Sequence, residues 1–477
     1  MSKSEKTKGE KIQEKLGYKY KNAWLKMNQK EQDQTFRFCQ SYIQFLNSVK
    51  TERESVEWAE REAIKNGFIS LDEMVRKNQK IRPGDKIYAI NRNKNIIFAV
   101  IGKKPLEEGI NIIGAHIDSP RIDLKPNPLY EDGELVLLKT HYYGGIKKYQ
   151  WVTTPLSLHG VIFKSNGDKV TLNIGENDDD PRFCICDLLP HLAQEQMQKK
   201  MANGIDGESL TVLFGSIPYD EEDLKNKIKT NILELLQQKY DLQEEDFQRA
   251  EIELVPAIKA CDVGLDRSMV GGYGQDDKVC AYTAFQAILE AKKIDKTALC
   301  IWIDKEEIGS EGNTGIKSPF FENTVAKLCN LSSDHYSDIL LKDTLNHSKC
   351  LSADVTALFD PNYADVDDKR NTAYLGNGVV IMKYSGARGK ADSSEANAEF
   401  VAEVTNLFNK NDVTWQSGEL GKVDLGGGGT IAMHLTKYGM DVLDVGPGLL
   451  SMHSPFEICS KADVYMSYKA YKTFYKQ

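Results

Sequence analysis

The chain has 477 residues, with 61 Lys and Arg against 70 Asp and Glu, which gives a formal net charge of -9. Hydrophobic residues make up 41% and charged residues 27%, as in an ordinary globular protein long enough for two domains. An acidic chain without a basic stripe is not expected to bind nucleic acid. Without a run of eighteen apolar residues it is not expected to span a membrane.

The cellular compartment can also be predicted from the sequence. Residues 1–30 are rich in Lys, Glu and Gln and lack the apolar core of a secretory signal. The nine cysteines are scattered, odd in number and without a CxxC pair, which argues against a disulfide framework. We therefore expect a reducing, cytoplasmic location.

The sequence of the N-terminal quarter of the chain predicts helices first and then strands. Residues 1–70 are predicted to be helical, because their apolar residues recur on one helical face. Residues 86–90 and 96–101 are predicted to pair as strands. The run 111–115 is apolar on both faces, which predicts a strand in the centre of a sheet.

The pattern changes after Pro120. Further prolines at 126 and 128 interrupt it. Strands are then predicted at 135–138, 157–163, 170–174 and 212–214. A highly charged stretch over 219–249 has helical spacing of its apolar residues. Residues 121–265 are therefore predicted to form an inserted β-rich domain.

Alternating strands and helices resume after residue 266. Helices are predicted at 279–291 and 430–438, and strands at 298–304, 379–382 and 441–445. This alternation predicts an α/β fold, in which a mixed sheet lies between two layers of helices in α/β/α order. Residues 1–120 and 266–477 are thus predicted to form one domain that the β-rich segment interrupts.

Polar residues with metal-binding chemistry stand next to these predicted elements. His116 and Asp118 follow the strand 111–115, and the pair Glu306–Glu307 follows the strand 298–304. The pair Asp276–Asp277 precedes a predicted helix. Imidazole and carboxylate groups are ligands of divalent metals, and a second carboxylate beside a ligand can act as a general base.

Each of these pairs also has a simpler interpretation. A histidine two residues before an aspartate is often a loop histidine beside a capping residue. Asp276–Asp277 could cap a helix, and Glu306–Glu307 could lie in a solvated loop. Adjacent carboxylates repel each other unless a cation lies near them, which favours the metal-site interpretation.

Two further residues complete a ligand set. Asp354 and His453 are uninformative alone, but with His116, Asp276 and Glu307 they make five ligands. A shared aspartate lets five ligands serve two zinc-type ions with three protein ligands each. A two-metal site suits hydrolysis at a carbonyl or phosphoryl centre.

The run Gly426–Gly429 before Thr430 resembles a phosphate cradle, but the P-loop and GxGxxG patterns are both absent. We instead expect Gly427 and Gly428 to bring the backbone close to the substrate or the metals. The HExxH pattern is also absent, which excludes a helix-borne single-zinc protease.

Several short segments together identify a family. They are 114–121 (GAHIDSPR), 143–145 (YGG), 274–277 (GQDD), 304–310 (DKEEIGS), 352–354 (SAD), 426–430 (GGGGT), 446–448 (GPG) and 453–455 (HSP). With these segments in order, nearly the whole chain resembles the aminopeptidase I and aspartyl aminopeptidase family of two-zinc exopeptidases. The resemblance implies a zinc-exopeptidase-like catalytic domain over 1–120 and 266–477. It also implies that 121–265 is a dimerisation domain, that twelve subunits form a tetrahedral assembly, and that peptides are the substrates.

The same resemblance implies roles for individual residues. His116, Asp276 and Asp354 would hold one zinc ion, and Asp276, Glu307 and His453 the other, with a cis peptide bond after Asp276. Glu306 would be the general base, taking a proton from water and passing it to the leaving amine. Asp118 would be the partner of His116, and His191 would reach a neighbouring subunit's site to stabilise the oxyanion.

Substrate preference is the point at which this chain departs from acid-selective relatives. They carry a lysine where Met382 aligns, and methionine offers no cation to an acidic side chain. Lys383 is the adjacent cation, so specificity for N-terminal Asp or Glu is the alternative. We expect neutral or apolar N-terminal residues to be preferred.

Other functions remain open from the sequence. A two-metal deacylase or amidase could use the same ligands, and a catalytically inactive oligomeric scaffold could retain the fold. Zinc is the expected metal, although cobalt and manganese share such ligands.

Overall fold

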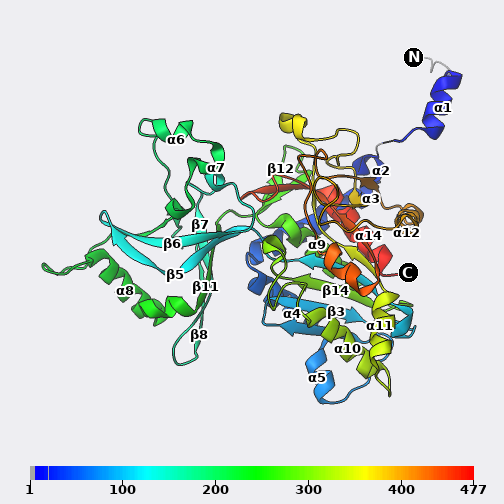
Figure 1. The fold of residues 1–477 in the computed structure, drawn as a ribbon, viewed down its shortest axis with the longest axis horizontal. Helices are drawn as coiled ribbons and strands as arrows, with labels where there is room; N and C mark the ends of the chain where they lie inside the picture. The colour runs from blue at the N-terminus through cyan, green and yellow to red at the C-terminus, as the bar shows by residue number, and fades with distance from the viewer. Residues whose placement is uncertain (1–5, 20) are drawn as a thin grey trace.

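The computed structural model describes residues 6–19 and 21–477. Residues 1–5 and 20, which fall in the first predicted segment 1–120, lie outside the described residues. The protein has a mixed α/β fold, as predicted, with one large sheet in the bulk of the molecule and a second sheet projecting from it (Figure 1). In the described ranges, no helix combines the length and apolar character needed to cross a membrane.

The large sheet has nine strands in the order β1-β2-β3-β14-β4-β15-β19-β17-β18. Their bounds are Ile69–Ser70, Lys86–Asn91, Asn95–Val100, Ala298–Ile303, Asn111–His116, Lys349–Ser352, Asp441–Gly446, Val379–Met382 and Trp415–Ser417, in that order. The central strands β14, β4, β15 and β19 are parallel to one another. Strand β3 is antiparallel to β14, and β17 is antiparallel to β19, so the sheet is mixed.

Helices cover both faces of this sheet because its central strands are apolar on both sides. In β3, Phe98 belongs to one hydrophobic core and Ile97 to the other. The first core is completed by α3 (Gln29–Ser48), α4 (Glu52–Lys65), α9 (Gln275–Leu289), α12 (Ala398–Lys410) and α14 (Lys461–Phe474). The second is completed by α5 (Leu71–Arg76), α10 (Phe320–Ser332), α11 (Asp338–Asn346) and α13 (Ala432–Leu435). Two short helices, α1 (Lys8–Leu16) and α2 (Ala23–Lys26), precede these layers.

The projecting sheet has seven antiparallel strands in the order β8-β7-β11-β5-β6-β10-β9. Their bounds are Lys169–Ile174, Leu156–Phe163, Ala250–Pro256, Arg121–Asp132, Leu135–Tyr143, Val212–Gly215 and Cys184–Ile185. Helix α8 (Lys227–Tyr240) packs on this sheet through Ile228, Ile232 and Leu236, and together they bury a separate core. The short helices α6 (Gln194–Gln198) and α7 (Met201–Gly204) lie in the connection between β9 and β10.

Two local predictions are wrong. The prolines at 126 and 128 lie inside β5, where the pairing with β6 shifts register between Leu124 and Leu129; a bulge tolerates residues that lack an N–H group. The helix predicted over 430–438 is reduced to α13 and a 3-10 turn over Thr436–Tyr438. The preceding glycines favour irregular backbone over helix.

A small third sheet joins the segments of the chain that carry Asp276 and His453. Its five strands are β12 (Cys261–Val263), β13 (Met269–Gly272), β21 (Glu457–Ser460), β20 (Gly448–Leu450) and β16 (Thr356–Ala357), in spatial order. Asp276 follows β13, and His453 lies in the turn between β20 and β21. This sheet therefore brings two distant segments to the edge of the large sheet.

Candidate active site

The predicted metal ligands meet at one edge of the large sheet. His116 is the last residue of β4, Asp354 lies two residues after β15, and the 3-10 turn Glu306–Ile308 follows β14. Because these three strands are parallel, their carboxyl ends lie at the same edge. Asp276 reaches this edge at the start of α9, and the peptide bond between Asp276 and Asp277 is cis, as the resemblance implies.

Asp276 lies between the two histidines. Its Oδ1 is 3.2 Å from His116 Nε2, and its Oδ2 is 3.1 Å from His453 Nε2. Asp354 Oδ1 lies 4.0 Å from His116 Nε2, while Glu307 Oε2 lies 3.5 Å from His453 Nε2. The five predicted ligands are thus arranged in two halves that share Asp276.

Both histidines are oriented by backbone carbonyl groups. His116 Nδ1 lies 3.0 Å from the carbonyl oxygen of Asp118, and His453 Nδ1 lies 3.0 Å from that of Gly145. An N–H at Nδ1 that donates to a carbonyl leaves the Nε2 lone pair directed at the cluster.

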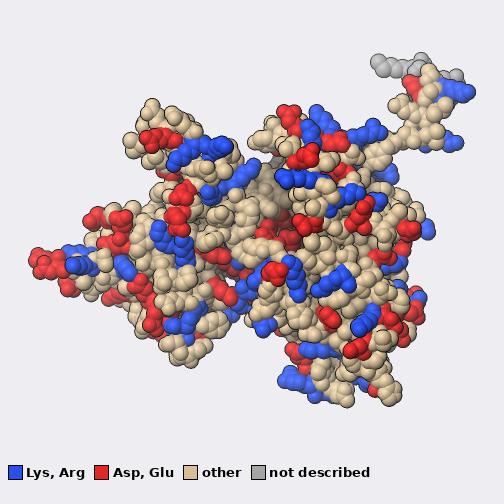
Figure 2. All heavy atoms as spheres, viewed as in Figure 1, with Lys and Arg blue, Asp and Glu red and all other residues tan. Residues whose placement is uncertain are grey.

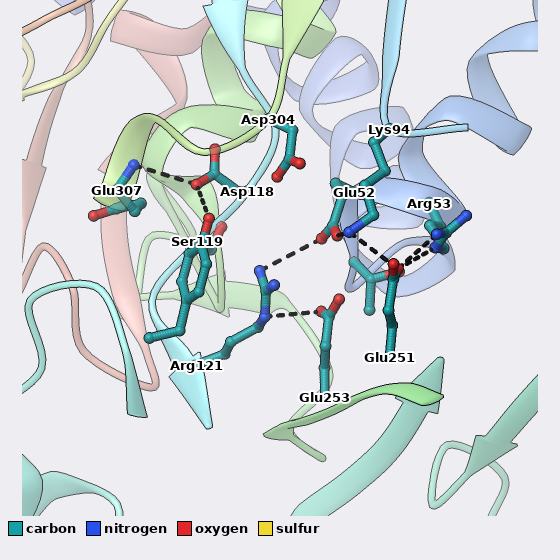
Figure 3. Close-up of polar contacts among 12 residues, drawn as sticks. Glu52, Arg53, Lys94, Asp118, Ser119, Arg121, Glu251, Glu253, Asp304 and Glu307 are labelled. Carbon is teal, nitrogen blue, oxygen red and sulfur yellow. Dashed lines mark hydrogen bonds and ion pairs between the residues drawn. The ribbon is translucent and has the colours of Figure 1, made fainter. Parts of the chain in front are cut away.

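The Asp118 side chain lies beside His116, as expected, and has further contacts that the sequence did not indicate. Its Oδ1 is 3.4 Å from His116 Nδ1, farther than the carbonyl oxygen of the same residue. Its carboxylate accepts the backbone N–H groups of Glu306 and Glu307, at 3.1 and 3.2 Å. Figure 3 shows the Asp118 carboxylate beside the Glu307 backbone. Asp118 therefore holds the turn that carries both glutamates.

The sequence argument missed Glu457, a buried residue of β21. Its Oε1 accepts the backbone N–H of His453 at 2.8 Å, and its Oε2 accepts that of Asp276 at 3.1 Å. Glu457 thus joins the segment of His453, four residues away in the chain, to that of Asp276, 181 residues away. Asp277 was named only as a neighbour of Asp276, yet its Oδ2 accepts the backbone N–H of His116 at 3.3 Å.

The electrostatics of the cluster are those of crowded buried acids. Burial raises the pKa of Glu306 to about 7, with Asp118 and Asp276 adding to the shift. Burial and neighbouring carboxylates likewise raise the pKa of Glu307 and of Asp354 well above their ordinary values. Burial acts against the charge of His453, but Asp276 and Glu307 outweigh it and raise the pKa of His453 to about 10. Among the described residues of the cluster, carboxylates outnumber the two imidazoles, which is why the pKa of His453 rises.

These residues fit divalent metal ions. Ligand atoms of His116, Asp276 and Glu307 all lie within 4.8 Å of one another, as do those of His116, Asp277 and Asp354. The buried Oε1 of Glu307 has no hydrogen-bond partner among the described residues. Mixed imidazole and carboxylate donors suit zinc, and a cation would relieve the repulsion among the acids.

A cavity of about 530 Å³ opens onto the cluster. Its apolar lining is Val355, Met382, Leu420, Met433 and Met452, and its titratable lining outside the predicted ligands and Glu306 is Lys317, Asp392 and His434. The predicted glycines Gly427 and Gly428 also line it. Figure 2 shows acidic side chains gathered in a hollow between the smaller and larger parts of the molecule.

Three of the predicted residues are not part of the cavity lining: Asp118, Lys383 and His191. Asp118 lies behind the Glu306–Glu307 turn that it holds. Lys383 has its Nζ 3.8 Å from Glu395 Oε1, whereas Met382 lines the cavity. His191 lies on an exposed turn of the projecting part, between β9 and α6, and does not line the cavity of its own chain.

Comparison with known proteins gives consistent matches. The family model described as aminopeptidase I zinc metalloprotease (M18) matches residues 45–475. A probable M18 family aminopeptidase 1 of Clostridium acetobutylicum is 52% identical over 455 residues, covering 95% of this chain and 98% of the relative. The crystal structure of an M18 family aminopeptidase from Thermotoga maritima matches with a TM-score of 0.91 and 44% identity, over 96% of this chain and 99% of that one. The structure of the S. cerevisiae mApe1 dodecamer shares the fold, with a TM-score of 0.73 and 21% identity over 92% and 96% of the chains.

Proposed function

The chain belongs to the M18 family of zinc aminopeptidases, and from that premise we propose that it removes the N-terminal residue of peptides by a reaction that uses two zinc ions. The observation that carries this proposal is the position of Asp276, whose two oxygens face the Nε2 atoms of two different histidines. His116, Asp276 and Asp354 would hold one ion, and Asp276, Glu307 and His453 the other. When bound, the ions lower the pKa of water and polarise the scissile carbonyl.

Glu306 is the proposed general base. Its Oε2 lies 3.9 Å from His116 Nε2 and borders the cavity, so it can reach a water molecule at the cluster. Burial raises the pKa of Glu306 to about 7, which suits a group that accepts and returns a proton near neutral pH. It takes a proton from the attacking water and gives it to the leaving amine.

The proposed substrates carry a neutral or apolar N-terminal residue. The cavity wall includes Met382, Met433 and Met452, which are adaptable apolar side chains. The cation nearest in sequence to Met382, Lys383, is directed to Glu395. Lys317 does line the cavity, but its Nζ lies 2.7 Å from Glu311 Oε1, so its charge is already paired.

We further propose that the working form is a homo-oligomer, as the name of the S. cerevisiae structure states for that protein. His191 is flanked by the exposed apolar side chains of Leu188, Leu189 and Leu192. An exposed apolar patch of this kind is typical of an association surface. Association through it would bring His191 to the cavity of a neighbouring subunit, where an imidazole could stabilise the oxyanion.

A panel of aminoacyl p-nitroanilides carrying Leu, Asp, Glu and Lys tests the proposal. We expect the Leu substrate to have the highest kcat/KM, because its side chain fits an apolar wall. Preference for Asp and Glu would overturn the proposed specificity but not the family. Hydrolysis of N-acetylated amino acids alone would indicate a deacylase, and no hydrolysis with zinc present would indicate a scaffold.

The variant Met382→Lys tests the wall residue directly. A lysine there places a cation in the cavity, so kcat/KM for the Asp substrate should rise about ten-fold relative to the Leu substrate. Lys383→Met is the matched control, since that side chain lies outside the cavity lining and should leave the ratio unchanged. An unchanged ratio in Met382→Lys would show that Met382 does not face the substrate.

A further inference from the structure

The segment Tyr143–Gly145 at the end of β6 touches the site at three points. The Tyr143 hydroxyl donates to Asp118 Oδ2 over 2.8 Å. A Cβ on Gly144, whose φ is 73°, would lie 3.3 Å from the Cβ of Glu307. The carbonyl oxygen of Gly145 lies 3.0 Å from His453 Nδ1. One strand end of the projecting sheet therefore contacts residues of both halves of the cluster.

Tyr143 is itself held in place by Arg121. The guanidinium carbon lies 3.9 Å from the centre of the Tyr143 ring, which is a close cation–π contact. Arg121 is in turn surrounded by carboxylates, with Nε 2.8 Å from Asp123 Oδ1 and 3.3 Å from Glu253 Oε2, and Nη1 3.4 Å from Glu52 Oε2. Figure 3 shows Arg121 between Glu52 and Glu253. A buried guanidinium with these partners has little freedom to move.

The residues around Arg121 come from two different layers. Glu52 begins α4, which packs on the large sheet, whereas Glu253 lies in β11 of the projecting sheet. Lys94 Nζ adds a second cation, 3.2 Å from Glu52 Oε1 and 3.0 Å from Glu251 Oε2. The ion cluster therefore fixes the projecting sheet against the large one just behind Tyr143.

We propose that Tyr143 is a positioning residue: its hydroxyl fixes the Asp118 carboxylate, and through it the Glu306–Glu307 turn, so that the projecting sheet sets the geometry of the metal site. This inference rests on the proposed function, because it treats Glu307 as a ligand and Glu306 as the base. The phenol is protonated at neutral pH and can donate to only one acceptor. Asp118 Oδ2 receives both this bond and the N–H of Glu307, so loss of the hydroxyl leaves that oxygen with the Glu307 N–H alone and weakens its hold on the turn.

The test is Tyr143→Phe, which removes one oxygen atom and keeps the ring against Arg121. Groups that orient a ligand typically change metal affinity ten- to a hundred-fold, so we expect the zinc affinity of the metal-free protein to fall about ten-fold. A chromogenic chelator competing for zinc measures this without any peptide substrate. With zinc at saturation, kcat for leucyl-p-nitroanilide should fall about ten-fold while KM stays within about two-fold.

Tyr142→Phe is the matched control, because Tyr142 is the preceding residue of the same strand and its side chain is exposed. A double-mutant cycle with Asp118→Asn then tests the route. If Tyr143 acts through Asp118, the double variant should bind zinc no more weakly than Asp118→Asn alone. Additive losses in the double variant would overturn the route, and wild-type zinc affinity in Tyr143→Phe would overturn the proposal.

Gly144→Ala provides a second and independent variant. Its Cβ would press on Glu307 in a backbone conformation that disfavours alanine, so zinc affinity should again fall while Tyr143 remains intact. Zinc affinity is measured separately from turnover, so the two proposals can fail separately. A wild-type protein that binds two zinc ions but cleaves no peptide would reject the proposed function, while the zinc affinities of the variants would still test the role of Tyr143. Unchanged zinc affinity in Tyr143→Phe would reject this inference and leave the proposed function standing.

Discussion

At the scale of single residues, the proposed ligands are fixed through their backbone groups. Asp118 accepts the N–H groups of Glu306 and Glu307, and Glu457 accepts those of His453 and Asp276. Each buried carboxylate thereby positions two residues while leaving their side chains free to face the cavity. Buried acids with two N–H donors are well satisfied, so the frame is present before any metal binds.

Glu306→Gln separates proton transfer from metal binding. The amide cannot accept a proton, and loss of a general base typically lowers turnover by two to four orders of magnitude, so we expect kcat to fall at least about 100-fold. Zinc content should stay at the wild-type value, because Glu306 is not among the proposed ligands. Measurement of kcat together with metal content checks both statements. Full activity in this variant would show that another group is the base.

The proposed ligands could be named from the sequence, whereas the contacts made by Glu457 and Tyr143 could not. His116 and Glu306–Glu307 follow strongly apolar runs, and such runs identify strand ends without reference to the rest of the chain. Glu457 and Tyr143 act through contacts with residues 181 and 25 positions away, which no local pattern encodes. The resemblance pointed to Tyr143–Gly145 as a motif but did not give it a role.

At the scale of elements, apolar periodicity predicted most of the large sheet correctly. Strands β2 and β3 pair as the segments 86–90 and 96–101 predicted, and β4 and β14 lie at the predicted runs 111–115 and 298–304. Strand β5 does not follow from the sequence pattern, because the two prolines suggest a break that a bulge in fact accommodates. Only part of the region 430–438 is helical, because the glycine-rich backbone before it lines the cavity in an irregular conformation.

The contact between α4 and β7 makes a second junction between the sheets, and it is sensitive to pH. His159 Nδ1 lies 2.7 Å from Glu54 Oε1, its Nε2 lies 3.1 Å from Glu176 Oε1, and Lys50 is the cation nearby. Burial acts against the charged imidazole, but the two glutamates outweigh burial and raise the pKa of His159 from 6.5 to about 9.

The sign of the pH dependence follows from this shift. Below about pH 6.5 His159 is protonated in both the folded and unfolded states, so its stabilising contribution is complete. As the pH rises toward about 9 only the folded state keeps the proton, and up to about 3 kcal/mol of unfolding free energy is lost. Urea unfolding of wild type and His159→Gln at several pH values measures the difference.

The expected result is a stability difference between wild type and His159→Gln that shrinks from pH 6 to pH 9. His141→Gln is the control, because His141 is an exposed histidine of the same sheet, in β6. A difference that stays constant, or grows with pH, would show that His159 is not charged in the folded protein.

At the scale of the whole molecule, the proposed site draws on two sheets and, through His191, on a neighbouring subunit. Within one chain, Tyr143 and the Gly145 carbonyl of the projecting sheet contact the site, while His191 does not line the cavity. His191→Ala should therefore lower kcat about 100-fold, the usual effect of losing an oxyanion donor, while the oligomer stays intact. Turnover at the wild-type rate would remove His191 from the mechanism.

Mixed oligomers decide whether His191 acts in its own chain or in a neighbour. Consider a pair of one His191→Ala subunit and one Glu306→Gln subunit. If each subunit supplies its His191 to the other's site, the His191→Ala subunit has a complete site and the Glu306→Gln subunit does not. Random mixing of equal amounts should then restore about a quarter of wild-type activity. Co-expression of the two variants followed by a rate assay measures this. No recovery would show that each site depends on its own histidine.

The central claim is that five side chains on separate elements hold two zinc ions beside Glu306. The most direct measurement is a titration of metal-free protein with zinc, in which hydrolysis of leucyl-p-nitroanilide and bound metal are followed together. The account predicts no hydrolysis without metal and full activity at two zinc equivalents per chain. Undiminished hydrolysis by the metal-free protein, or full activity at a single equivalent with no second ion bound, would contradict it.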